Sequence, residues 1–383
     1  MAGALHWVEV DHEALAHNVR VVRQALGGVQ LWAVVKAQAY GHGAVETART
    51  ALAAGAAGLI VAVVDEAVEL RAAGLDAPIL VLTPPLVDQA PAYATYDLIA
   101  AVADLETARA LAQAGQVRGR PIPVHIKVDT GMGRLGVRPE ETPALVRAVH
   151  GLPGVRVAGL FTHMAAADEE DLTSARTQLA RFDQVQVVLD RDGLRPEVVH
   201  AANSAAALVL PESRYSLARI GIALYGIAPS PAVARTLAAA GMRLVPALAF
   251  RARVVAARRV PAGWPISYGS TYVTAAETTI ATLPVGYSDG VSHGLSHKLH
   301  VLMHGQRRPV VGRICMNHCM VDAGDLPVRP GDVVTLLGRD GDEEITAEEW
   351  AAHLGTIPYE IVCMVGSRNP RRHLAASAGF SAP

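Results

Sequence analysis

A lysine at the end of an apolar run is the first residue that could carry covalent chemistry. Lys36 closes the segment LWAVVK and is followed by AQAYGHG. An amine at the end of a buried strand is unfavourable unless it is paired or used chemically. A neutral lysine amine can form a Schiff base with an aldehyde. The alternative is a side chain that runs past the rim of the sheet into solvent.

Two further strand ends carry charged or titratable side chains. The segment VHIKVDTGMGRLGV places Lys127, Asp129 and Arg134 at the end of an apolar run, and His163 follows LFT. The first three residues fit either an ion-paired strand end or the charged lining of a site. His163 could act as a base or pack on a flat ring, and a core histidine is the alternative.

The last two strand ends suggest an anion site. Ser204, in HAANSAA, stands where a helix can begin, so its hydroxyl and the free backbone N–H groups there can bind phosphate. The segment RIGIALYG adds Arg219 and Gly221, and phosphate sites in barrels recur at these positions. A Schiff-base lysine, a partner for a flat ring, a phosphate seat and an arginine together favour pyridoxal 5'-phosphate as the cofactor.

The elements that must position these residues alternate between apolar runs and Ala-rich helical segments. The expected strands are Leu31–Ala37, Leu59–Val64, Ile79–Leu82, Leu98–Val102, Val124–Val128, Val157–Thr162, Val198–Ala201 and, as an eighth, Ile220–Leu224. The expected helices are Ala44–Ala54, Asp65–Ala73, Leu105–Ala114, Glu140–Val149 and Leu172–Leu189. This α/β pattern fits a (β/α)8 TIM-like barrel. An open doubly wound sheet is the alternative, but no G-x-G-x-x-G follows the first strand.

The pattern changes near Met242, where helical stretches nearly vanish and turn signals such as PAG separate short apolar runs. The expected strands there are Ala249–Ala256, Thr279–Leu283, His300–Met303, Val310–Ile314 and Val333–Leu337. We therefore expect a barrel over residues 1–242 and a mainly β domain over 243–383 whose ordered part ends near Ser367. The tail after His373 is predicted to be disordered.

Composition excludes several classes of protein. Of 383 residues, 51% are apolar and 18% charged, so a large core can form, and a net charge of -2 offers no basic surface for nucleic acid or anionic membrane. Three cysteines argue against a disulfide framework. With no secretory signal expected at the start, these features predict a cytoplasmic protein that takes a small substrate.

Nearly the whole chain resembles the alanine racemase family. The resemblance rests on AVVKAQAYGHG, VHIKVDTGMGRLGV, LFTHMA, HAANSAA and ARIGIALYG, and continues with ISYGSTY, LPVGYSDG, VGRICMNHCM and IPYEIV. It implies a pyridoxal-phosphate enzyme with an N-terminal barrel and a C-terminal β domain, to which the first strand, at about residues 6–10, also contributes. It also implies a cytoplasmic homodimer in which each barrel mouth faces the partner's β domain, and a role in making D-alanine for peptidoglycan.

The resemblance assigns two bases to proton transfer at Cα, since one base cannot easily serve both faces of a flat intermediate. Lys36 matches the Schiff-base lysine and Tyr268, in ISYGS, matches the second base, which the other subunit supplies. Without the family, Tyr268 would be taken for a core aromatic of a strand. Arg219 matches the arginine beside the pyridine nitrogen, where a donor-only guanidinium disfavours ring protonation and so favours racemisation over transamination.

Other positions match binding residues of the family. His163 matches the histidine behind the ring, Arg134 the residue at the phenolic oxygen and the substrate, and Met316 the backbone N–H that meets the substrate carboxylate. The remaining cofactor-binding matches are Tyr40, Asn203, Ser204, Gly221, Ile222 and Tyr359. Tyr287 and Tyr359 match the entryway.

Lys127 matches a lysine that is often carbamylated, which would turn a cation beside Arg134 into an anion. Two residues depart from the usual pattern: Gln38, where Asn or Asp is usual beside that carbamate, and Asn317, where Asp is usual after Met316.

Three other functions remain open at the level of sequence. A broad-specificity or serine racemase would keep the cofactor and change the substrate. A decarboxylase, aldolase or dehydratase on the same scaffold would need an acid at the pyridine nitrogen or a metal-binding pair. A non-catalytic cofactor-binding barrel would lack the β domain. No metal site is expected, because the strand-like segment KLHVLMHG breaks the helical spacing of His293, His297, His300 and His304.

Overall fold

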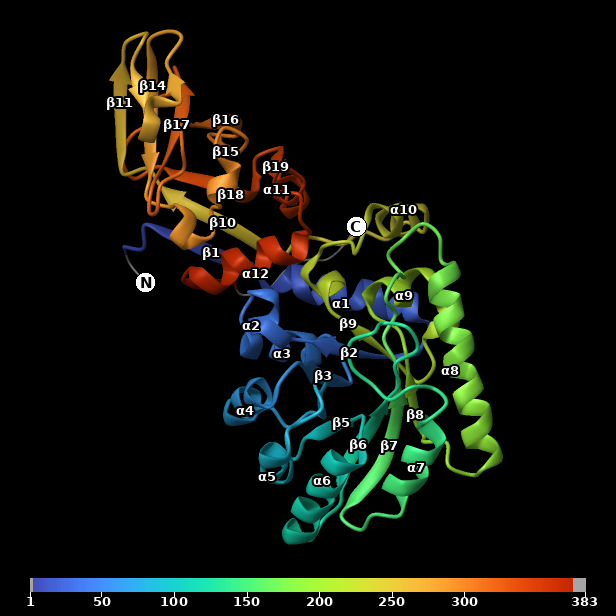
Figure 1. The fold of residues 1–383 in the computed structure, drawn as a ribbon. Coiled ribbons are helices and arrows are strands. Elements are labelled where there is room, and N and C mark those ends of the chain that lie inside the picture. Colours follow the sequence, from blue (N-terminus) through green and yellow to red (C-terminus); the bar gives the residue numbers. More distant parts are fainter. Residues whose placement is uncertain (1–2, 375–383) are drawn as a thin grey trace. The chain divides into compact units, whose positions relative to one another are not determined.

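The computed structural model describes residues 3–374, which form two compact units. The barrel unit comprises residues 14–39 and 44–245, and the β unit comprises residues 3–13, 40–43 and 246–374 (Figure 1). The expected disorder of the tail concerns residues that, from 375 onward, lie outside this range.

The barrel unit is built on eight parallel strands in the order β8-β7-β6-β5-β4-β3-β2-β9. Their bounds are β2 Gln30–Val34, β3 Gly58–Val61, β4 Ile79–Val81, β5 Ile99–Val102, β6 Ile122–Lys127, β7 Val155–Phe161, β8 Val198–His200 and β9 Leu217–Ile220. Between β8 and β9, Ser216 N donates to Val199 O (2.9 Å) and Arg219 N to Ala202 O (3.0 Å). The sheet confirms the predicted (β/α)8 fold class.

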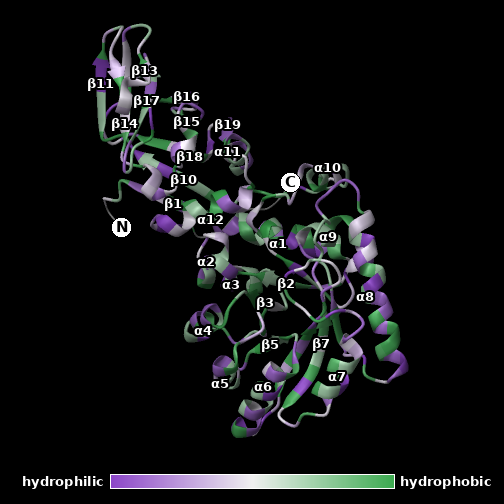
Figure 2. Ribbon diagram, viewed as in Figure 1, coloured by the Kyte–Doolittle hydropathy of each residue, from purple (hydrophilic) through white to green (hydrophobic). Residues whose placement is uncertain are grey.

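Helices follow most of these strands (Figure 1). Helix α1, His12–Leu26, precedes the first of them. The helices that come later are α2 Lys36–Tyr40, α3 Ala44–Ala53, α4 Val64–Ala72, α5 Ala90–Thr95, α6 Leu105–Arg118, α7 Thr142–His150, α8 Thr173–Arg191, α9 Ser204–Val209 and α10 Pro231–Ala239. Strands β3 and β4 are buried along their whole length, as expected for a parallel sheet covered on both faces, whereas the helices alternate hydrophobic and hydrophilic residues (Figure 2).

The eighth strand was placed too late in the sequence. It spans Leu217–Ile220 rather than Ile220–Leu224, because Gly221, at φ −109° and ψ −100°, ends the extended conformation. The residues that follow form a short 3₁₀ turn, Ile222–Tyr225, which Gly226 ends at φ 84°. The apolar run therefore continues through two different conformations.

The β unit holds a sheet with the order β11-β14-β17-β16-β15-β18-β10-β1-β20, and β19 pairs with β18. The N-terminal strand β1 pairs antiparallel with β10 and parallel with β20. The bounds are β1 His6–Asp11, β10 Leu248–Arg253, β11 Ala256–Val260, β12 Pro265–Ile266, β13 Tyr272–Val273, β14 Thr278–Leu283, β15 His300–Met303, β16 Gln306–Val311, β17 Cys319–Gly324, β18 Val333–Asp340, β19 Glu343–Ile345 and β20 Arg371–Leu374.

Two helices of the β unit were not predicted: α11, Ala347–Leu354, and α12, Pro358–Arg368. The Thr346 hydroxyl caps α11 by accepting from Glu349 N (3.2 Å), and Gly355 ends it in the left-handed region. A proline at the first position begins α12. The described structure also continues past Ser367 into β20, so the expected domain end was too early.

Candidate active site

Lys36 is half-buried and lies two residues after β2, which ends at Val34 instead of running to Ala37. The chain then makes a single left-handed turn, α2, with φ between 52° and 53° at Ala37, Gln38, Ala39 and Tyr40. A left-handed conformation costs a non-glycine residue about 1–2 kcal/mol. Such strain persists only where surrounding contacts enforce it and clusters at functional sites.

Arg219 is 2% exposed at the end of β9, and its guanidinium is surrounded by acceptors. Nη2 donates to Thr162 O and Ala201 O, both at 2.9 Å, and to His163 Nδ1 at 3.1 Å, while Nη1 donates to His200 Nδ1 at 2.9 Å. Burial lowers the pKa of the guanidinium to about 9. Arg219 therefore remains a cation and a donor at neutral pH, held in one orientation.

Because guanidinium cannot accept a hydrogen bond, Nδ1 of His163 and Nδ1 of His200 must both be unprotonated. Burial, and next Arg219, lowers the pKa of both imidazoles well below the usual value. His200 then carries its proton on Nε2 and donates it to His125 Nδ1 at 2.9 Å. His163 is thus a neutral ring that is hydrogen-bonded to Arg219.

Lys127 lies close enough to three other cations for their charges to change its pKa. Burial, followed by the nearby charges of Arg134, Arg219 and Lys36, lowers the pKa of Lys127 to about 8. Only Asp129 opposes them, although its carboxylate accepts from the backbone N–H groups of Gly131, Met132 and Gly133 at 2.9–3.1 Å. None of the ion pairs found within residues 3–374 involves Lys127, Asp129 or Arg134, so the ion-paired strand end is not observed. The excess of positive charge suits an anionic ligand.

The proposed phosphate seat joins two loops of the barrel unit. Gly221 N donates to Ser204 Oγ at 2.8 Å, and Asn203 caps α9 by accepting from Ala206 N at 3.0 Å. Asn203 Nδ2 also donates to Met164 O, after β7. Ser204 opens α9 and Ile222 opens the adjacent 3₁₀ turn, so backbone N–H groups of two helical starts lie in this region.

Tyr40 and Tyr359 lie together in the β unit, with ring centroids 6.2 Å apart. Close backbone packing brings them there: a Cβ on Gly41 would lie 2.4 Å from Val362 O, and a Cβ on Gly366 would lie 2.3 Å from Gly41 O. Only glycines at both positions allow this approach between the segment after α2 and helix α12.

Tyr268 is 71% exposed, so it is not a core aromatic. It begins a 3₁₀ turn, Tyr268–Ser270, and lines a groove of about 610 Å³ with Trp264, Cys315 and His318, among others. Met316 is 55% exposed and also lies in the β unit.

The loops that carry Tyr287 and Met316 are bonded to each other. Tyr287 N donates to Cys315 O at 3.1 Å, and Ser288 Oγ donates to Met316 O at 2.8 Å. Asn317, the departure from the family pattern, donates from Nδ2 to Ser288 Oγ at 2.9 Å. The amide therefore takes part in fixing this loop pair.

The other departure, Gln38, donates from Nε2 to Glu69 Oε2 at 2.8 Å. Sequence reasoning missed Glu66, which accepts from Ala37 N, and the linked histidines His125 and His200, of which His200 accepts from Arg219. A histidine inside an apolar strand run, as in VHIK and VVH, is the signal that could have found the last two.

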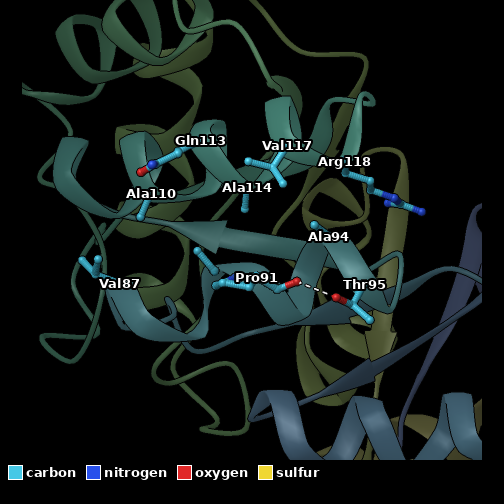
Figure 3. Close-up of a pocket in the computed structure, with 10 residues that line it drawn as sticks. Val87, Pro91, Ala94, Thr95, Ala110, Gln113, Ala114, Val117 and Arg118 are labelled. Atoms are coloured by element: carbon cyan, nitrogen blue, oxygen red, sulfur yellow. Dashed lines mark hydrogen bonds between the residues drawn. The ribbon is translucent and has the colours of Figure 1, made fainter.

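A second groove, of about 640 Å³, lies between α5 and α6 (Figure 3). Its walls are mainly apolar, and it contains none of the predicted site residues. The one charged side chain among its lining residues, Arg118, pairs with Asp97 at 3.0 Å. We do not count this groove as part of the active site.

Within the described residues, no three His, Cys, Asp or Glu side chains are grouped so as to hold a metal ion. The helices in the same range are all too short or too polar to cross a membrane.

Comparison with known proteins identifies the family. The model for the N-terminal domain of alanine racemase matches residues 10–229, and that for the C-terminal domain matches residues 247–373. An alanine racemase of Symbiobacterium thermophilum is 47% identical over 95% of this chain and 96% of its own length. One of Desulfovibrio desulfuricans is 45% identical over 95% and 97%.

Solved structures agree with this result. An alanine racemase from Streptomyces lavendulae superposes with a TM-score of 0.91 at 39% identity, covering 98% of both chains. A histidine racemase from Leuconostoc mesenteroides superposes with a TM-score of 0.89 at 28% identity, covering 98% of this chain and 99% of its own. The chain belongs to the alanine racemase family, whose enzymes depend on pyridoxal 5'-phosphate.

Proposed function

We propose that this protein interconverts L-alanine and D-alanine, with Lys36 and Tyr268 of the partner subunit as the two bases. The observation that carries the proposal is a group of residues in the barrel unit: the buried Arg219 bonds His163, and the charges of Arg219 and Lys36 both help to keep that imidazole neutral. The names of the relatives, at 40–47% identity, support alanine as the substrate.

The residues present fit pyridoxal 5'-phosphate. Three cations, Arg134, Arg219 and Lys36, act on Lys127, and one carboxylate, that of Asp129, opposes them. The cofactor and substrate would bring phosphate, phenolate and carboxylate groups. When bound, the cofactor supplies the electron sink that acidifies the Cα proton.

Each binding residue would then have one task. Lys36 would hold the aldehyde carbon, and Arg134 would bind the phenolic oxygen and the substrate. Arg219 would face the pyridine nitrogen and disfavour its protonation, since guanidinium only donates. The residues proposed for the phosphate are Tyr40, Asn203, Ser204, Gly221, Ile222 and Tyr359.

Two bases on opposite faces of Cα allow the proton to leave one face and return on the other. Lys36 would move the proton of the D-enantiomer, and the partner's Tyr268 that of the L-enantiomer. The exposure of Tyr268 and Met316 supports a homodimer in which both residues serve the other subunit's barrel. Tyr287 and Tyr359 would form the substrate entrance.

Lys127 would be carbamylated. Its lowered pKa, about 8, raises the fraction of neutral amine, and only that form attacks carbon dioxide. The new N–C bond forms with loss of one proton and leaves an anion among Arg134, Arg219 and Lys36. The Gln38 amide donates to Glu69 Oε2, so we assign it no part in holding the carbamate.

A broader substrate range is the second candidate function. The histidine racemase has the same fold at a TM-score of 0.89, so the scaffold by itself does not select alanine. Three cysteines without a disulfide support a reducing compartment, and we propose a cytoplasmic enzyme that supplies D-alanine for peptidoglycan.

Proton NMR of L-alanine with the purified protein and pyridoxal phosphate in D₂O, followed by chiral analysis, tests the proposal. Loss of the Cα proton with accumulation of D-alanine is the expected result. Exchange with serine or a basic amino acid but not with alanine would favour the broader racemase. Exchange with no amino acid would contradict a racemase and leave a cofactor-binding role.

A further inference from the structure

Glu66 joins the first turn of α4 to the residue that follows Lys36. Its Oε2 accepts from Ala62 N at 2.7 Å and from Val63 N at 3.3 Å, and its Oε1 accepts from Ala37 N at 2.6 Å. All four residues belong to the barrel unit. One carboxylate therefore binds backbone groups of two separate strand ends, those of β2 and β3.

Capping of α4 explains the hydrogen bonds of Glu66 to Ala62 and Val63 but not the one to Ala37. Glu66 is the third residue of α4, and a glutamate there commonly bonds back to the N-cap backbone N–H. That function needs the bonds to Ala62 and Val63 alone. The bond to Ala37 adds nothing to the cap, and it reaches a residue that no helical turn of α4 includes.

The Ala37 bond acts on a strained segment. Four consecutive non-glycine residues, 37–40, are left-handed, a conformation that their side chains disfavour. The bond Ala39 N to Val35 O, at 2.9 Å, closes the turn, and Gln38 Nε2 bonds Glu69 Oε2, one turn further along α4. Glu66 and Glu69 lie one turn apart on α4, but Glu66 binds the backbone of the turn, whereas the printed contact of Glu69 is to the end of the Gln38 side chain.

The peptide group between Lys36 and Ala37 carries the N–H that Glu66 binds, so fixing that group fixes the direction in which the chain leaves Lys36. On the other side, Val35 N donates to Ile60 O at 2.8 Å and continues the register of β2 with β3. We propose that Glu66 is a positioning residue for Lys36: it enforces the left-handed turn and thereby aims the lysine amine. This inference rests on the proposed cofactor-binding role of Lys36.

The first test compares Glu66→Ala with Glu69→Ala in the holoenzyme. Glu66→Ala should lower kcat about 100-fold with a much smaller change in KM, because a misplaced reacting group slows chemistry more than substrate binding. Glu69→Ala, the matched control on the same helix, removes one side-chain contact and should change kcat less than about 3-fold. Equal effects of the two variants would overturn the proposal.

A glycine rescue separates positioning from capping. Ala37→Gly removes the steric penalty of the left-handed region, so it should restore kcat of Glu66→Ala about 10-fold. Ala72→Gly, at the exposed end of α4, adds the same backbone freedom in a right-handed helix and should restore nothing. Equal rescue by both glycines, or by neither, would contradict the proposal. If Glu66→Ala does not fold, Glu66→Gln, which keeps one acceptor oxygen, takes its place with a smaller expected loss.

Hydrogen exchange gives a readout that does not depend on the reaction. In the full chain the Ala37 amide should be protected, and Glu66→Ala should raise its exchange rate at least about 10-fold while Glu69→Ala leaves it unchanged. An unprotected Ala37 amide in the unmodified protein would overturn the proposal that Glu66 holds the turn. Borohydride trapping of the cofactor on a residue other than Lys36 would instead contradict the proposed function, so the two failures are distinguishable.

Discussion

Arg219 and Tyr268 lie in opposite environments. Arg219, in the barrel unit, is 2% exposed, and four acceptors fix its guanidinium. Tyr268, in the β unit, is 71% exposed on a short turn. The Arg219 guanidinium is thus fixed within one chain, while Tyr268 and Met316, which the proposed function assigns to a partner's site, are exposed. Under the proposed function, the surroundings of Lys36 are preorganised by the fold, whereas Tyr268 would gain its environment only on assembly with a partner subunit.

Removing the preorganised base should have the largest effect. Lys36→Met should lower racemisation about 10⁴-fold, since both proton transfer and cofactor attachment are lost. Chiral analysis of alanine and the absorbance of bound cofactor measure the two losses. Lys298→Met, on the surface of the β unit, is the control and should retain activity. A Lys36→Met enzyme with more than about a tenth of normal activity would contradict this role.

Removing the exposed base should lower activity without loosening the fold. Tyr268→Phe should reduce kcat about 10²–10⁴-fold, the usual contribution of one acid–base group. Its free energy of unfolding should change by less than about 0.5 kcal/mol, because the side chain is mostly exposed. Tyr96→Phe provides a matched control for the loss of a hydroxyl. A large loss of stability in Tyr268→Phe would show that the tyrosine is structural.

The lowered pKa of Lys127 predicts how the free energy of unfolding changes with pH. Its folded pKa is about 8 and its unmodified unfolded value is 10.5, so the unfolded chain binds more protons between these values. The free energy of unfolding should therefore rise by at most about 3 kcal/mol from pH 8 to pH 10.5 in protein freed of carbon dioxide. Lys127→Met should abolish the rise. Chemical denaturation at a series of pH values measures it, and a falling stability over this range would contradict the sign.

The same lysine gives a direct test of carbamylation. Protein equilibrated with ¹³C-labelled bicarbonate should show a carbamate carbon signal by NMR, and the signal should disappear in Lys127→Met. An unlabelled, bare amine under these conditions would reject the modification.

Asn317→Asp should have the smallest effect. It restores the usual family residue in the exposed loop pair and removes one exposed hydrogen bond, the one that Asn317 Nδ2 donates to Ser288 Oγ. We expect kcat/KM for alanine to change less than about 3-fold, measured with serine as a comparison substrate. A change above about 10-fold would show that this departure sets substrate range.

Much of the barrel could be predicted from the sequence, because apolar runs and helical segments alternate at lengths that a parallel sheet requires. The end of strand β9 within RIGIALYG could not be predicted, since the apolar residues continue from the strand into a 3₁₀ turn. Helices α11 and α12 carried readable signals at Thr346 and Pro358 that the expected β pattern obscured. Hydrophobic periodicity reports burial better than it reports backbone conformation.

Some features of the candidate site could likewise be predicted from the sequence and others could not. Lys36, Arg219 and His163 could be found because polar residues at strand ends are exceptional in an apolar run. The left-handed turn at AQAY could not, because alanine, glutamine and tyrosine all prefer other conformations and the contact that holds the turn comes from Glu66, on another element.

A mixture of Lys36→Met and Tyr268→Phe chains tests most directly whether the fixed base of one subunit works with the exposed base of another. Each mixed dimer would contain one site with both normal bases and one with neither. Dissociating and reassociating equal amounts of the two inactive variants should therefore restore about a quarter of normal activity. No recovery, with mixed dimers demonstrated by mass spectrometry, would contradict the shared site and place both bases in a single chain.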